Sequence, residues 1–75
     1  MTEEATVLYD FAGLHENGEI SLSEGETIRV INKNIGDGWW EGSTMDGRVG
    51  LFPEAYVQVI SNGMSVSSLL FVLNC

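Results

Sequence analysis

Residues 39–53 read WWEGSTMDGRVGLFP and place two runs of strand-forming residues around an Asp-Gly pair. Because successive side chains of a strand point to opposite faces, Trp39 and Trp40 cannot both enter one small core. Trp39 shares its parity with the polar Glu41. Trp40 shares its parity with the small Gly42. The alternation therefore assigns Trp39 to the outer surface, where a rigid indole suits recognition of a partner.

The same stretch predicts a β-hairpin. Asp46-Gly47 separates the two runs, and glycine tolerates the positive φ that a type I′ turn requires. We therefore expect a two-residue turn at this pair.

The rest of the chain repeats the pattern of short β-branched or aromatic runs and glycine-bearing breaks. The sequence predicts an all-β fold, a small barrel with strands at Thr6–Phe11, Thr27–Asn32, Trp39–Thr44, Arg48–Phe52 and Val57–Ile60. Between them we expect a tight turn at Ser23–Glu26, polar loops at Ala12–Glu19 and Asn32–Gly38, and one helical turn at Pro53–Tyr56.

Alternation also predicts which side chains form the core. The inward set is Ala5, Val7, Ile20, Leu22, Ile28, Val30, Gly42, Phe52 and Val57. Gly42 leaves space at an inward position, and we expect the bulky Phe52 to fill it. Four aromatic residues at strand ends or beside loops are left over and are expected to be half-exposed: Tyr9, Phe11, Trp39 and Tyr56.

Length and charge limit the function. A chain of 75 residues forms one small domain with little interior for a substrate pocket, which favours a binding module over an enzyme. The formal charge of −8 disfavours nucleic acid and anionic lipid and favours a basic partner. Cys75 is the only cysteine, so no intramolecular disulfide forms, which fits a cytoplasmic location. We expect no metal site and no cofactor, and His15 has no assigned role.

The two ends of the chain differ from its centre. We divide it into an N-terminal extension (1–4), a domain (5–60) and a tail (61–75). The apolar run Leu69–Leu73 is too short to cross a bilayer. Three accounts of the tail remain open: a truncated or alternative end of a longer adaptor, a segment that folds back on the barrel, or a partner-binding tail.

Four motifs in one order resemble those of the SH3 domain over residues 5–60. They are Val7-Leu8-Tyr9-Asp10-Phe11, Glu19-Ile20-Ser21-Leu22, Trp39-Trp40-Glu41-Gly42 and Gly50-Leu51-Phe52-Pro53-Glu54-Ala55-Tyr56-Val57. The tryptophan and GLFP patterns are similar to those of endocytic and membrane-trafficking adaptors, sorting nexins among them. The resemblance implies a five-stranded barrel of two orthogonal sheets, a short 3-10 turn near its C-terminal end, and a non-catalytic groove for PxxP peptides.

The resemblance also implies roles for single residues. Tyr9, Phe11, Pro53 and Tyr56 would line two pockets for dipeptides of the ligand, and Trp39 would wall a third pocket for its arginine or lysine. The acidic side chains of Glu16, Glu19 and Asp37 would read that basic residue.

Three positions depart from the family pattern. Phe11 and Leu51 replace common tyrosines, and Ala55 replaces a common asparagine. Fewer polar donors predict weaker or unusual ligands.

The leading interpretation is a monomeric adaptor module in signalling or endocytosis that binds proline-rich basic peptides, without nucleic-acid binding or membrane insertion. The alternative is a structural or assembly domain whose aromatic face packs on a folded partner or on its own tail.

Overall fold

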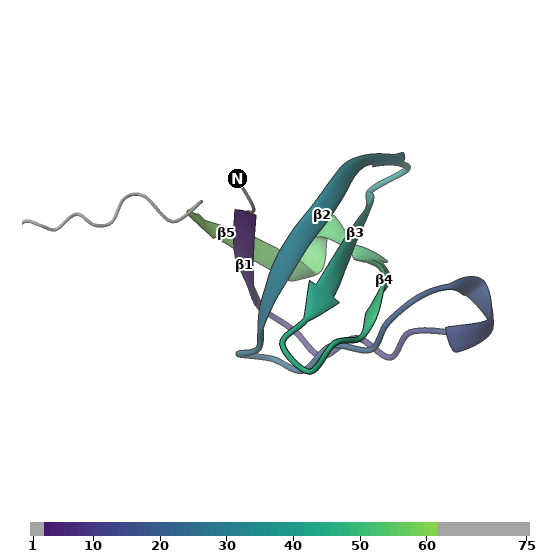
Figure 1. Ribbon diagram of the computed structural model, residues 1–75, viewed down its shortest axis with the longest axis horizontal. Helices are drawn as coiled ribbons and strands as arrows, with labels where there is room; N and C mark the ends of the chain where they lie inside the picture. The colour runs from purple at the N-terminus through teal and green to yellow at the C-terminus, as the bar shows by residue number, and fades with distance from the viewer. Residues whose placement is uncertain (1–2, 62–75) are drawn as a thin grey trace, which may run out of the picture.

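The computed structural model describes residues 3–61, and short strands make up most of this segment (Figure 1). The strands are β1 (Glu3–Val7), β2 (Thr27–Gly36), β3 (Trp39–Thr44), β4 (Val49–Pro53) and β5 (Val57–Ser61). Two 3-10 turns complete the fold, η1 (His15–Asn17) and η2 (Glu54–Tyr56). The expected all-β fold is thereby confirmed, and η1 is an additional element inside the expected loop 12–19.

The strands form one antiparallel sheet in the order β4-β3-β2-β1-β5, which confirms the expected five-stranded barrel. The long strand β2 joins the two halves. Its first residues, Thr27 to Val30, pair with β1, and the strand also pairs with β3 from Ile28 to Gly36. Because β2 belongs to both halves, the two sheets that we expected are continuous through its backbone hydrogen bonds.

The core contains the residues that alternation places inside. Ala5, Ile28 and Phe52 are fully buried, and Gly42 is buried beside them. The whole predicted inward set is confirmed, because each of its members is buried in the structure. Trp40 packs on this core from one side, with its ring centre 6.5 Å from that of Phe52.

The first strand differs from the expected range Thr6–Phe11. It begins at Glu3 and ends at Val7, where its ladders to β2 and β5 end. The chain then leaves the sheet, and Phe11 makes only an isolated antiparallel bridge with Leu22. The aromatic residues of this segment therefore lie on the long loop 8–26, and not on a strand within the sheet.

The hairpin between β2 and β3 is tighter than expected. The sequence predicted a loop at Asn32–Gly38, but β2 continues to Gly36, which pairs with Trp39. Asp37 and Gly38 form the turn, with φ values of 57° and 83°. Two central residues with positive φ are typical of a type I′ turn.

The hairpin at Asp46-Gly47 is confirmed, but its predicted turn type is wrong. The amide of Gly47 donates to the carbonyl of Thr44, and the amide of Thr44 donates to the carbonyl of Arg48. Gly47 has a φ of 94°, whereas Asp46 has no positive φ. This geometry matches a three-residue loop that ends in a left-handed glycine.

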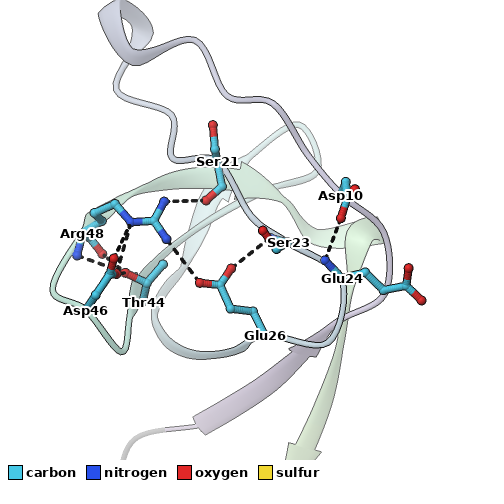
Figure 2. Close-up of polar contacts among 8 residues, drawn as sticks. All are labelled: Asp10, Ser21, Ser23, Glu24, Glu26, Thr44, Asp46 and Arg48. Atoms are coloured by element: carbon cyan, nitrogen blue, oxygen red, sulfur yellow. Dashed lines mark hydrogen bonds and ion pairs between the residues drawn. The ribbon is translucent and has the colours of Figure 1, made fainter.

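The long loop 8–26 is fastened to this hairpin by Arg48 (Figure 2). The guanidinium donates to the carbonyl of Ser21 over 2.8 Å and to Glu26 over 3.2 Å, and it also binds Asp46. One side chain thus holds two points of the long loop to the hairpin.

Candidate functional site

Four aromatic rings form a continuous row on the surface. Tyr9 meets Tyr56 with ring centres 5.8 Å apart, and Tyr56 meets Phe11 at 5.6 Å. Phe11 in turn meets Trp39 at 6.1 Å. All three contacts are edge-to-face, an arrangement that fixes ring positions and adds about 0.5–1.5 kcal/mol per pair beyond burial. We call these four residues the aromatic row.

Elements that are far apart in sequence supply the row. Tyr9 and Phe11 come from the start of the long loop, and Trp39 begins β3. Pro53, the last residue of β4, lies opposite Trp39 in the sheet, and η2 then carries Tyr56 back to the row. The structure therefore brings all five residues predicted to contact a peptide into one surface.

Trp39 lies on the outer face, as its parity predicted. It is half-buried against Phe11, whereas Trp40 is the tryptophan that packs on the core. Trp40 is itself only half-buried, and the ammonium of Lys33 lies 4.9 Å from its ring centre. Lys33 also pairs with Glu3 over 2.5 Å. These contacts lie on the Trp40 face of β3, opposite to the face that carries Trp39.

The three acidic residues predicted to bind the basic side chain of a ligand differ in their surroundings. Glu16 is exposed in η1, and Asp37 is exposed in the β2–β3 turn. Glu19 is half-buried, and its carboxylate accepts the amide hydrogen of Leu14 over 2.8 Å. Glu19 therefore stabilises its own loop, a role that its place in the sequence did not reveal.

The Asp37 turn lies close to the row. The amide of Glu54, at the start of η2, donates to the carbonyl of Gly38 over 2.8 Å. This bond ties the turn to the segment that contains Pro53 and Tyr56. Asp37 is consequently held beside the Trp39 end of the row.

Glu41 is an acidic residue that we did not select from the sequence. It lies opposite Leu51 in the sheet, and it shares the outer face with Trp39 because the two residues are two positions apart on β3. The strand alternation that placed Trp39 on the outer face also places Glu41 there.

Two of the three lysine and arginine side chains in residues 3–61 lie in ion pairs away from the row. Within residues 3–61, Lys33 pairs with Glu3, and Arg48 pairs with Glu26 and Asp46. The described residues contain no cluster of three or more His, Cys, Asp or Glu side chains suited to a metal ion. No helix among them has the length and apolar character needed to span a membrane.

Two relatives among curated proteins are similar to the chain over its central part. Sorting nexin lst-4 of Caenorhabditis elegans is 53% identical over 49 residues, which are 65% of this chain and 9% of that protein. Drebrin-like protein of Dictyostelium discoideum is 40% identical over 55 residues, which are 73% of this chain and 11% of that protein. The chain thus spans about a tenth of the length of these relatives.

Solved structures show the same fold. The C-terminal SH3 domain of myosin IB from Entamoeba histolytica, bound to the EhFP10(GEF) peptide, has a TM-score of 0.70 and 28% identity, over 80% of this chain and 95% of that one. The Acanthamoeba myosin I SH3 domain bound to Acan125 has a TM-score of 0.68 and 38% identity, over 77% of this chain and 95% of that one. The family model of the variant SH3 domain matches residues 7–58, so the chain belongs to the SH3 family of peptide-binding interaction modules.

Proposed function

We propose that this domain binds extended proline-rich segments of the PxxP type that carry an arginine or lysine beside the prolines. It acts as an adaptor, by holding a partner in place and not by catalysing a reaction. The observation that supports this proposal is the aromatic row itself, in which four rings and Pro53 share one surface.

A polyproline II segment suits such a surface. It is extended before binding and loses little conformational entropy, so shallow slots between rings suffice to hold it. Tyr9, Phe11, Pro53 and Tyr56 form the slots in this proposal, and Trp39 walls the place of the basic residue. An arginine can stack on an indole and bond a carboxylate in the same pose.

Charge supports a basic ligand. The chain carries a formal charge of −8, and exposed Glu16 and Asp37 lie in the two loops that flank the row. Their attraction for a cation is expected to weaken as salt rises, because exposed charges are screened over about 8 Å at physiological ionic strength. For a small, shallow contact we expect an affinity of about micromolar or weaker.

We also propose a cellular role for the protein that contains this domain. The similarity to a sorting nexin and to a drebrin-like protein supports an adaptor in membrane trafficking or signalling. In this proposal the domain acts in the cytoplasm as a monomer. The partner is then a basic proline-rich segment of another protein.

The test is a heteronuclear NMR titration with a PxxP peptide that carries an arginine, and with a control peptide in which alanine replaces both prolines. We expect the PxxP peptide alone to shift the signals of Tyr9, Trp39 and Tyr56. Trp39→Lys should abolish these shifts while the dispersed spectrum of the fold persists. A saturating PxxP peptide that leaves the row unshifted, together with shifts on adding a globular partner, would support the assembly alternative instead.

Charge is tested by neutral variants that preserve local structure. Glu19→Gln keeps an oxygen that can accept the Leu14 amide, and Asp37→Asn keeps a residue that tolerates positive φ. Both should weaken an arginine peptide more than a peptide with a neutral residue in that position. Glu4→Gln on β1 is the matched control, and equal losses for both peptides would remove the proposed role of the carboxylates.

A further inference from the structure

A second hollow lies beside the β4 strand, away from the rings of the aromatic row. It is lined by Gly13, His15, Glu19 and Ser21 of the long loop and by Arg48 and Val49 at the start of β4. Its volume is about 220 Å³. We call it the β4 hollow.

The outer face of β4 runs from the aromatic row to Val49, which lines the β4 hollow. Alternate residues of a strand share a face, so Pro53, Leu51 and Val49 point the same way. Pro53 lies opposite Trp39, and Leu51 is half-buried between the two regions. The backbone of Glu19 forms a β-bridge with Leu51, and Glu19 also lines the hollow.

The size of the hollow selects the kind of occupant. It exceeds the cavity of about 150 Å³ that can hold benzene, and it is smaller than the pockets of about 300–1,000 Å³ that hold cofactors and drug-sized ligands. One or two side chains of a peptide fit it best.

The chemistry of the walls limits the occupant further. Val49 is 57% exposed and offers apolar surface at the edge. The guanidinium of Arg48 is held by Asp46, Glu26 and the Ser21 carbonyl, so its charge is already engaged (Figure 2). Glu19 adds a negative charge, which disfavours an acidic occupant.

We infer that the β4 hollow is an auxiliary subsite for the same peptide ligand, and that it takes an aliphatic side chain from a neutral or basic segment beyond the arginine. This inference rests on the proposed function, because the row must hold the prolines first.

The reach of the ligand follows from strand geometry. Val49 lies four residues from Pro53 on β4, which is roughly 13 Å at the usual strand rise. A polyproline II chain rises about 3.1 Å per residue, so the side chain that reaches Val49 belongs to about the fourth residue past the arginine.

The experiment compares three peptides by calorimetry and NMR. The first is a PxxP core with its arginine. The second continues five residues beyond the arginine with leucine at the fourth, and the third has glycine in place of that leucine. The protein is the full chain, its Val49→Ser variant and a matched Ile60→Ser variant, since Ile60 is 54% exposed on β5.

We expect the leucine extension to raise the affinity of the unmodified chain about fivefold over the core peptide, as partial burial of one aliphatic side chain allows. The gain should disappear in Val49→Ser and with the glycine peptide, and it should persist in Ile60→Ser. The core peptide should bind all three proteins equally. The amide signals of Gly13, Ser21 and Val49 should shift only with the leucine extension.

Two results overturn the inference. An equal gain in Val49→Ser, or no gain in the unmodified chain while the core peptide still shifts the row, refutes the subsite and leaves the proposed function intact. Failure of the core peptide to bind the row refutes both.

Discussion

Gly42 is a residue at which the absence of a side chain matters to the core. A Cβ built there would lie 2.8 Å from Cε2 of Phe52, which confirms the predicted contact between the two positions. It would also lie 2.6 Å from the carbonyl oxygen of Arg29 on β2. The backbone contact was not predictable from side-chain volumes, because it depends on how closely β2 and β3 approach.

We predict that Gly42→Val destabilises the fold by about 1–3 kcal/mol or more, since the added atoms overpack a closed core. Phe52→Val in the same chain should relieve only part of this loss, because the Arg29 carbonyl remains in place. Urea unfolding of the two single variants and the double variant measures the coupling. Ser43→Val, on the outer face of the same strand, is the control, and strictly additive losses would contradict the contact.

Glu19 stabilises its own loop and is also one of the carboxylates proposed to bind the basic ligand residue. Its side chain accepts the Leu14 amide, and its own amide donates to the Leu14 carbonyl over 3.3 Å. Its motif position indicated an acidic residue near the ligand. Only the folded loop revealed that this residue also fixes the turn that carries Glu16.

Among the elements, the two hairpin turns differ from the turn types expected for them. The type I′ geometry expected at Asp46-Gly47 occurs instead at Asp37-Gly38, where a longer loop was expected. Asp-Gly occurs at residues 37–38 and again at residues 46–47, and the first pair forms the type I′-like turn. The second pair lies in a wider loop, where the Thr44 hydroxyl donates to Asp46 and accepts the Arg48 amide. These side-chain hydrogen bonds stabilise a three-residue loop in place of the two-residue turn. The Asp-Gly dipeptide alone therefore predicted a hairpin but not its turn type.

The wider loop has a predicted pH dependence. Hydrogen bonds from the Thr44 hydroxyl and then from the Arg48 guanidinium hold the pKa of Asp46 below its usual value of 3.8. A carboxylate with a lowered pKa in the folded state stabilises the fold above 3.8, and this contribution is lost as the pH falls through the folded-state value. Asp46→Asn should therefore lower the melting temperature at neutral pH.

Thermal unfolding at a series of pH values checks this prediction. The gap between the unmodified chain and Asp46→Asn should narrow as the pH drops below 3.8, because the unmodified chain then carries a neutral side chain as well. We expect a small gap, since Asp46 is exposed and its charges are screened by solvent. A gap that stays constant to the most acidic pH would show that the charge of Asp46 does not contribute.

At the scale of the whole molecule, the barrel brings distant segments to one surface. The long loop, the start of β3, the end of β4 and η2 each supply part of the aromatic row. The charged side chains of Lys33 and Arg48 are paired elsewhere within residues 3–61. The net charge of −8 supports the proposed basic ligand.

The tail expected from the sequence covers residues 61–75; Ser61 is the last residue of β5, and residues 62–75 lie outside the described residues. We predict that deleting residues 62–75 leaves peptide affinity unchanged, because Ser61 still pairs with Glu4 and every residue of the row is retained. Calorimetric titration of both chains with the same PxxP peptide measures this. A large loss of affinity would show that the tail belongs to the binding domain.

The all-β class, the inward set and the outer position of Trp39 were predictable from the sequence, because strand alternation is a local property of neighbouring residues. The sequence also indicated, through their motifs, the five residues that share the surface of the aromatic row. The tertiary structure decided the end of β1, the turn types, the tie between Glu19 and Leu14, and the β4 hollow. These features depend on contacts between segments distant in sequence, and such contacts exist only once the chain has folded.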